Sequence, residues 1–192
     1  MRIFSIVFLL LTWLLGGSQN FILDNFPTKD GLIYYSEVIE VDSSLSAIDI
    51  YLNAKNWLLD AFKSSKSVIQ LDDKELGVIT VKSYIKKRIP YSDESQIWFT
   101  LKLEMKEGRY RYSLSNVQIE YVVTITSPPV HVEEDFETLI YKAENPQSTK
   151  KWMIKANEEW KNYCEGLCKE LGSDFKNIIT SFKSVMSIKK DW

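Results

Sequence analysis

The sequence is poor in the residues that most often form catalytic and metal sites. It has one histidine, His131, and two cysteines, Cys164 and Cys168. Catalysis by a Ser-His-Asp or Cys-His arrangement would depend on that single imidazole, and nothing around it resembles a nucleophile elbow. Only seven glycines occur, and none of them form a phosphate-binding loop. The sequence therefore predicts no catalytic residue, no metal site and no cofactor, and we do not expect an enzyme.

An excess of charge of one sign is also missing. The 24 Lys and Arg residues are balanced by 26 Asp and Glu residues, which leaves a net charge of −2. No general basic field attracts nucleic acid, so we expect no nucleic-acid partner. The composition, 45% hydrophobic and 26% charged, is too apolar for a disordered chain and too polar for a membrane bundle.

Long apolar runs are absent except at the N-terminus. Met1 and Arg2 precede an apolar stretch over residues 3–15, and small residues follow at 16–18. This order is typical of a secretory signal peptide, which we place at residues 1–18 with cleavage near Ser18. About 13 apolar residues fall short of the roughly 20 that span a bilayer. We therefore expect a periplasmic or secreted protein, without a lipobox cysteine and without a stable membrane span after cleavage.

The first part of the mature chain is predicted to form an arm, a strand and a helix. The arm covers residues 19–31 and is expected to end in a turn. Residues 32–41 contain β-branched and Tyr residues without Gly or Pro, which predicts a strand. A helix N-cap signal stands at 42–44. Behind it, a stripe at 3.6-residue spacing predicts the buried face of the helix, and its members are Leu45, Ile48, Leu52, Leu59 and Phe62.

Four strand candidates follow, at 68–71, at 78–85, at 97–105 and from residue 110 onward. The third alternates apolar and polar residues most regularly. Glu107 and Gly108 then predict a tight hairpin turn, which would place Glu104 opposite Arg111.

The apolar positions of the last strand change phase. They fall on even numbers up to Leu114 and on odd numbers from Val117. A strand cannot exchange its two faces without an extra residue, so we expect a bulge or break near residues 115–117.

The C-terminal part is predicted to be mainly helical. A connecting segment over 121–148 is expected to contain a short helix at 133–143. A long helix is predicted at 149–188, with a kink or a break at Gly172 and Ser173, since glycine ends helices and serine begins them. The whole pattern predicts an α+β fold: a two-layer β-α-β4-α arrangement in which one antiparallel sheet is covered by an N-terminal helix and a long C-terminal helix.

Four segments together resemble a known family. They read DGLIYYSEV at 30–38, AKNW at 54–57, VIQLDDKE at 68–75 with Gly77 after it, and KEGRYRY at 106–112. They are similar to an uncharacterised family of exported Bacteroides-type proteins, described as a domain of unknown function with a TBP-like (TATA-binding-protein-like) fold. The resemblance covers about residues 30–120. It implies the same β-α-β4-α order, and it implies no activity, substrate or catalytic residue. The name of the fold does not imply DNA binding.

The remaining polar clusters allow more than one interpretation. Cys164 and Cys168 lie four residues apart on the predicted helix, where a disulfide would be strained. They could be small apolar residues on a helix flank, a redox or metal pair, or an intermolecular disulfide. His131 with the acidic residues 133–135 lacks zinc-ligand spacing and favours an acidic helix start. The acidic residues of 72–75 lack a calcium-loop pattern and favour a solvated turn.

One group of residues is a candidate interaction surface. Trp98 stands on the polar face of its strand, and a basic hairpin tip is formed by Lys102, Lys106, Arg109 and Arg111. Of these residues, the predicted surface comprises Trp98, Lys102, Arg109 and Arg111. Exposed aromatic side chains often mark interaction surfaces, although the segment after residue 121 could simply cover Trp98.

We therefore expect a non-enzymatic binding or interaction module of the bacterial cell envelope, whose partner is an unknown protein or a small apolar ligand. The alternative is a helix-grip-like carrier, in which the aromatic residues line an apolar cavity between the sheet and the C-terminal helix.

Overall fold

The computed structural model describes residues 22–62, 68–90, 92, 95–147 and 150–188, and the predicted signal peptide lies outside these ranges. Among the described residues, a six-stranded sheet consists of β3 (Tyr35–Glu40), β4 (Ile69–Asp73), β5 (Val78–Lys86), β6 (Ser95–Lys106), β7 (Arg109–Val123) and β8 (Val130–Asp135). The α-helices are α2 (Ala47–Ala61), α4 (Phe136–Glu144) and α5 (Lys151–Met186). A short 3-10 helix, η1 (Ile22–Asn25), and a small hairpin of β1 (Thr28–Lys29) and β2 (Leu32–Ile33) precede them.

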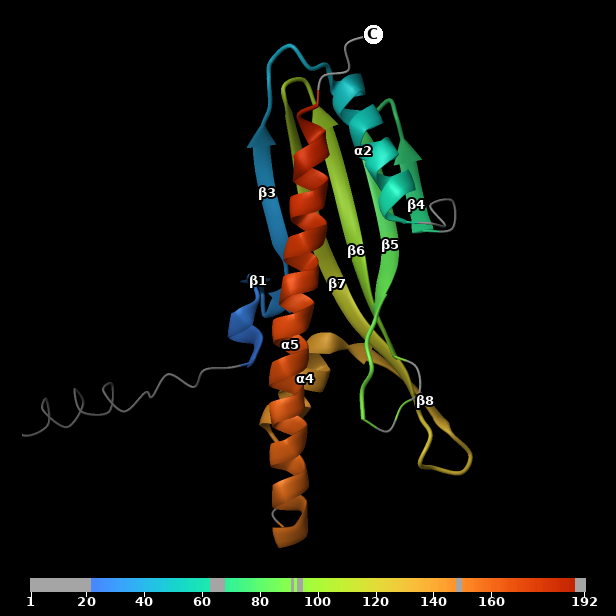
Figure 1. Ribbon diagram of the computed structural model, residues 1–192, viewed down its shortest axis with the longest axis vertical. Coiled ribbons are helices and arrows are strands. Elements are labelled where there is room, and N and C mark those ends of the chain that lie inside the picture. Colours follow the sequence, from blue (N-terminus) through green and yellow to red (C-terminus); the bar gives the residue numbers. More distant parts are fainter. Residues whose placement is uncertain (1–21, 63–67, 91, 93–94, 148–149, 189–192) are drawn as a thin grey trace, which may run out of the picture.

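The sheet is organised around β7. The strand order is β3-β7-β6-β5-β4, and each neighbouring pair is antiparallel. The first half of β7 pairs with β3, and its second half, from Gln118 to Val123, pairs with β8. The two strands therefore lie end to end along the same edge of β7 (Figure 1).

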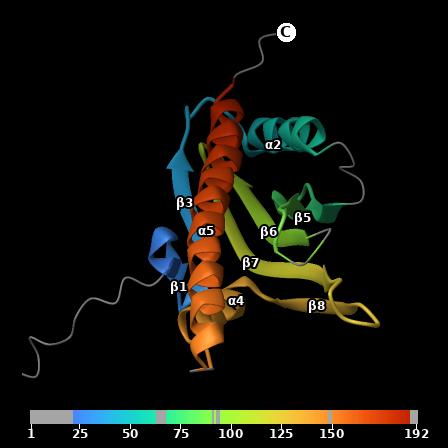
Figure 2. The same ribbon diagram turned by 60° about the horizontal axis from the view of Figure 1, so that its bottom comes forward.

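All three α-helices contribute to one core on one face of this sheet. Figures 1 and 2 show α5 running along the sheet, with α2 beside its C-terminal half and α4 against its N-terminal half. Every second residue of β6 is buried, as expected for a strand with one covered face. The rings of Phe175 and Phe182 on α5 pack against Phe99 and Tyr110 of the sheet. This arrangement confirms the predicted α+β class with a single helix-covered antiparallel sheet.

The hairpin and the bulge predicted from the alternation are both present. Lys106 pairs with Arg109 and Glu104 pairs with Arg111 around the turn, where Gly108 adopts a φ of +65°. The pairing of β6 and β7 shifts register between Trp98 and Thr100, because β7 contains one extra residue there. Asn116 lies in that bulge with a φ of +53°. The inserted residue explains why the buried positions of β7 change from even to odd numbers.

The predicted buried face of the first helix is wrong within α2 itself. Ile48, Leu52 and Leu59 are exposed, and the opposite face of α2 is buried instead. The two predicted residues that flank the helix do meet the core, Leu45 as a buried and Phe62 as a partly buried side chain. That buried face consists of Ile50, Tyr51, Asn53, Ala54, Trp57 and Leu58. The predicted cap is also displaced, because Ser46 caps α2 through a capping box with Asp49. Both faces of this helix carry apolar residues, so spacing alone could not select the one that meets the sheet.

The break predicted at Gly172 and Ser173 is absent, because α5 is one helix from Lys151 to Met186. Figure 1 shows no sharp kink along it. Gly172 is buried, and a Cβ atom at this position would lie 3.7 Å from the ring of Phe26. This is an ordinary van der Waals distance, so the packing of η1 against α5 does not require a glycine here. The predicted arm contributes to the core, with Ile22 and Phe26 both buried.

Two boundaries differ from the predicted ones. The strand expected at 32–41 is interrupted at Tyr34, where the chain passes from the small hairpin to the main sheet. Residues 133–135, expected to begin a helix, belong to β8, and the helix starts at Phe136. Among the described residues, no helix combines the length and the apolarity that crossing a bilayer requires.

Candidate interaction surface on the open face of the sheet

The face of the sheet opposite the helices carries the residues predicted as an interaction surface. Trp98, Lys102 and Glu104 occupy the alternate, partly exposed positions of β6. Arg109 and Arg111 occupy the exposed positions at the start of β7. We call this side of the sheet the open face. The backbone period of two places the four predicted residues there, because their neighbours in the sequence fill the core.

Trp98 is held among polar and aromatic neighbours. Its indole Nε1 donates a hydrogen bond to Glu120 Oε2 at 2.8 Å. Its ring lies 4.8 Å from the ring of Tyr84, measured between centroids, and the ammonium of Lys82 lies 5.5 Å from its centroid. These contacts come from β5 and β7, and they leave Trp98 half-buried. The indole is therefore positioned as a partly exposed aromatic platform.

Glu104 organises the basic residues beside it. Arg111 Nε donates to Glu104 Oε2 at 2.8 Å, and Arg111 Nη2 lies 2.7 Å from the same oxygen. Lys102 Nζ lies 3.3 Å from Glu104 Oε1. Partial burial raises the pKa of Glu104, but the hydrogen bonds from Arg111 and Lys102 outweigh it, so the pKa falls below its ordinary value. Glu104 thus remains a carboxylate shared by two cations.

A cavity of about 270 Å³ opens beside this group. Its walls come from β3, β6 and β7: Val38, Glu104, Lys106, Arg109, Tyr110 and Arg111. Two of the predicted surface residues, Arg109 and Arg111, line it, together with Lys106 of the predicted basic hairpin tip. Val38 also lines it and was not predicted, because only the pairing of β3 with β7 brings it to this place.

A second cavity, of about 370 Å³, lies at the notch between β3 and β8. The bulge residue Asn116 lines it, with Lys82 and Thr100 from the sheet and Glu137 from α4. Glu137 Oε1 accepts a hydrogen bond from the backbone N–H of Ile33 at 2.7 Å. Its partial burial raises the pKa of the carboxyl. This hydrogen bond ties β2 to α4 at the edge of the second cavity, so the role of the Glu137 carboxyl is structural.

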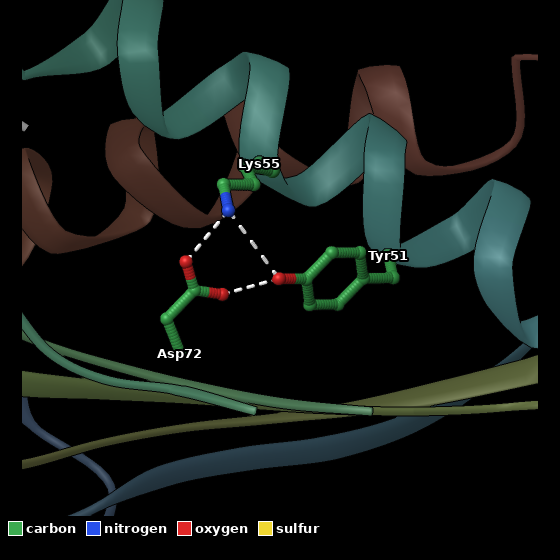
Figure 3. Close-up of polar contacts among 3 residues, drawn as sticks. All are labelled: Tyr51, Lys55 and Asp72. Carbon is green, nitrogen blue, oxygen red and sulfur yellow. Dashed lines mark hydrogen bonds and ion pairs between the residues drawn. The ribbon is translucent and has the colours of Figure 1, made fainter. Parts of the chain in front are cut away.

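A polar triad on the covered face joins α2 to the edge strand β4 (Figure 3). Lys55 Nζ lies 2.6 Å from Asp72 Oδ2 and 3.5 Å from the hydroxyl of Tyr51, and that hydroxyl donates to Asp72 Oδ1. Burial and the bond to Asp72 raise the pKa of Tyr51, so its hydroxyl stays protonated near neutral pH. A protonated phenol bonded to a carboxylate is not an activated base. The triad acts as a tie between helix and sheet.

The acidic residues considered for calcium are occupied by the protein itself. Asp72 belongs to the triad, and Asp73 Oδ1 accepts a hydrogen bond from the backbone N–H of Leu76 at 2.8 Å. His131 lies in β8, and its Nε2 lies 3.3 Å from Glu120 Oε1. Among the described residues, no three His, Cys, Asp or Glu side chains are placed to hold one metal ion.

The two cysteines are free and fully buried on α5. Burial raises the pKa of Cys164 to about 12 and also raises that of Cys168. Thiols in this state are poor nucleophiles. Of the interpretations left open by the sequence, the structure favours two small apolar residues in the core.

The comparisons with known proteins agree with this fold. Residues 35–120 match the sequence profile of a family described as "Domain of unknown function (DUF4468) with TBP-like fold". This segment is similar to a DUF4468 domain. The resemblance noted over residues 30–120 is confirmed, and the DUF4468 match ends just after the bulge of β7. No curated protein matches the chain.

Two solved structures are similar to the chain. One is a TBP-like protein from Parabacteroides distasonis, with a TM-score of 0.55 and 18% identity, covering 84% of this chain and 99% of its own. Another is a DUF4468 family protein from Bacteroides ovatus, with a TM-score of 0.48 and 17% identity, covering 84% of this chain and 92% of its own. The first likeness supports the TBP-like fold beyond the DUF4468 segment.

Proposed function

We propose that this protein is a non-enzymatic binding module of the bacterial cell envelope, and that the open face of its sheet is the binding surface. The observation that carries the proposal is the asymmetry of the sheet. The helices bury one face, while the other presents Trp98, Tyr84 and a cluster of cations to solvent. Partly exposed aromatic groups and arginines are both enriched at interfaces.

The aromatic packing does not favour the alternative, a helix-grip-like carrier. That function needs space between α5 and the sheet. The described rings in that layer pack edge to face at centroid distances of 5.2–6.3 Å. The single ring of Phe182 contacts three of them, Trp57, Tyr110 and Tyr112. These side chains fill the layer that a carried ligand would occupy.

Native mass spectrometry tests the binding function. The mature protein would be purified from its own host as wild type and as the double variant Trp98→Ala with Lys102→Glu. A matched control, Tyr141→Ala with Lys169→Glu, makes the same kinds of change at exposed positions of α4 and α5. We expect one bound species with the wild type and the control, and its loss from the open-face variant. Binding that persists in the folded open-face variant, or that is absent from all three proteins, would contradict the proposal.

Export is part of the same proposal, and it rests on the signal-like residues 1–18. Sequencing the N-terminus of the protein from fractionated host cells tests it. We expect a new N-terminus close to Gln19 in the periplasmic or extracellular fraction. Recovery of the chain from the cytoplasm with residues 1–18 intact would refute export.

A further inference from the structure

Two cations at the end of the β6–β7 hairpin face each other, and neither forms an ion pair within the described part of the chain. Lys106 and Arg109 pair directly across the hairpin, and both are exposed. Like charges in this position destabilise an antiparallel pair. Glu40 is the register partner of Arg109 in β3, and Glu107 lies in the turn. Even so, within the described part of the chain neither Lys106 nor Arg109 forms an ion pair or a side-chain hydrogen bond.

Arg111 adds a third cation to the same cavity. Its guanidinium is fixed by Glu104, which is the only acidic side chain among the described lining residues. That carboxylate is already shared with Lys102. The cavity walls therefore carry three cations against one neutralised carboxylate, and the local charge favours an anion.

The shape of the cavity limits the size of that anion. Its volume of about 270 Å³ is close to the lower end of the range for small-molecule sites, about 300 Å³. Val38, which is 55% exposed, forms an apolar part of the wall. A bound group would thus meet cations on one side and hydrocarbon on the other.

We propose that this cavity binds an oxyanion, either a carboxylate or a phosphate, carried by a small ligand with an adjoining apolar part. Lys106 and Arg109 contact the oxyanion, and Val38 contacts the carbon next to it. An arginine fork matches the oxygens of either group with two parallel hydrogen bonds. The unfavourable pairing of two cations at the hairpin is then relieved by the ligand. This inference rests on the proposed binding function, and it specifies the class of ligand.

Calorimetric titration of the mature protein at low ionic strength tests the inference. The probes are inorganic phosphate, octyl phosphate and octanoate. We expect saturable binding of at least one octyl probe at 1:1 stoichiometry, and weaker binding of inorganic phosphate, which cannot contact Val38. The preference between octyl phosphate and octanoate distinguishes the two oxyanions.

Two variants locate the site. Lys106→Gln with Arg109→Gln should weaken the binding at least tenfold. Lys169→Gln with Lys176→Gln removes the same charge from exposed positions of α5 and should change it less than twofold. The first variant should also unfold at the same or a higher urea concentration than the wild type, because a like-charge pair is lost.

Three results would overturn the inference: no saturable binding of any probe, equal weakening in both variants, or a clear loss of stability in the first variant. The outcome is separable from that of the proposed function, because neither Trp98 nor Lys102 lines this cavity. A host partner that depends on those two residues can exist without anion binding, and the reverse also holds.

Discussion

Both faces of the sheet carry aromatic and charged residues, but they use them differently. On the covered face, polar groups join one layer to the other: Lys183 on α5 pairs with Glu37, and Tyr112 donates to the same carboxylate at 3.1 Å. On the open face, Glu104 and Arg111 join two strands of the same layer. The first kind of contact fixes helices on the sheet, and the second leaves its outer surface available. This difference separates the residues that stabilise the fold from those that are candidates for binding.

The largest expected difference in stability is between the loss of one aromatic side chain from the covered face and the loss of one from the open face. Phe182 is 1% exposed and contacts three rings, so Phe182→Ala should lower the free energy of unfolding by about 3–5 kcal/mol. Trp98→Ala, at a half-buried position of the open face, should cost only about 1–2 kcal/mol. Urea unfolding followed by circular dichroism measures both.

Phe182→Ala could leave too little stability for a folded baseline. Phe182→Leu provides a milder change, with an expected loss of about 1–2 kcal/mol. An equal loss of unfolding free energy in Phe182→Leu and Trp98→Ala would agree with the proposed difference between the covered and the open face. A larger loss in Trp98→Ala than in Phe182→Leu would contradict it.

The next prediction concerns the tie between α2 and β4. The hydrogen bond from Lys55, followed by that from Tyr51, lowers the pKa of Asp72. Because both partners of the ion pair are about one-third exposed, Asp72→Asn should cost only about 1 kcal/mol at pH 7.

The sign of the pH dependence follows from that lowered pKa. The contribution is complete above the ordinary aspartate pKa of about 3.9 and is lost as the pH falls through the lower pKa of the folded state. The difference in unfolding free energy between wild type and Asp72→Asn should therefore disappear in acid. Urea unfolding from pH 7 to pH 2 measures it, and a difference that grows toward acid would show that the tie is not ionic.

The smallest expected effect belongs to the open face. Glu104 and Arg111 form a cross-strand pair in which the arginine side chain is 52% exposed. A double-mutant cycle with Glu104→Gln and Arg111→Gln should give a coupling energy of about 0.2–1 kcal/mol. The cycle needs urea unfolding at two salt concentrations, since screening should reduce an exposed pair further. A coupling larger than that of Lys55 with Asp72 would reverse the comparison of the two faces.

Local patterns predicted the features that depend on the backbone period. The turn at Gly108, the bulge at Asn116 and the positions of Trp98, Lys102, Arg109 and Arg111 on one face all follow from alternation along β6 and β7. The cavity was harder to predict. Val38 reaches it only because β3 pairs with β7, and pairing between strands 70 residues apart has no signal in one sequence.

The sequence by itself determined the strand alternation, the hairpin, the bulge and the helical character of the C-terminal part, because each depends on neighbouring residues and fixed backbone geometry. Only the tertiary structure decided which face of α2 is buried and that α5 continues through Gly172. It also decided that residues 130–135 add a strand to β7. These outcomes depend on the competition of segments for one sheet surface, where burial of large rings such as Trp57 and Phe182 outweighs the small local preferences for caps and breaks.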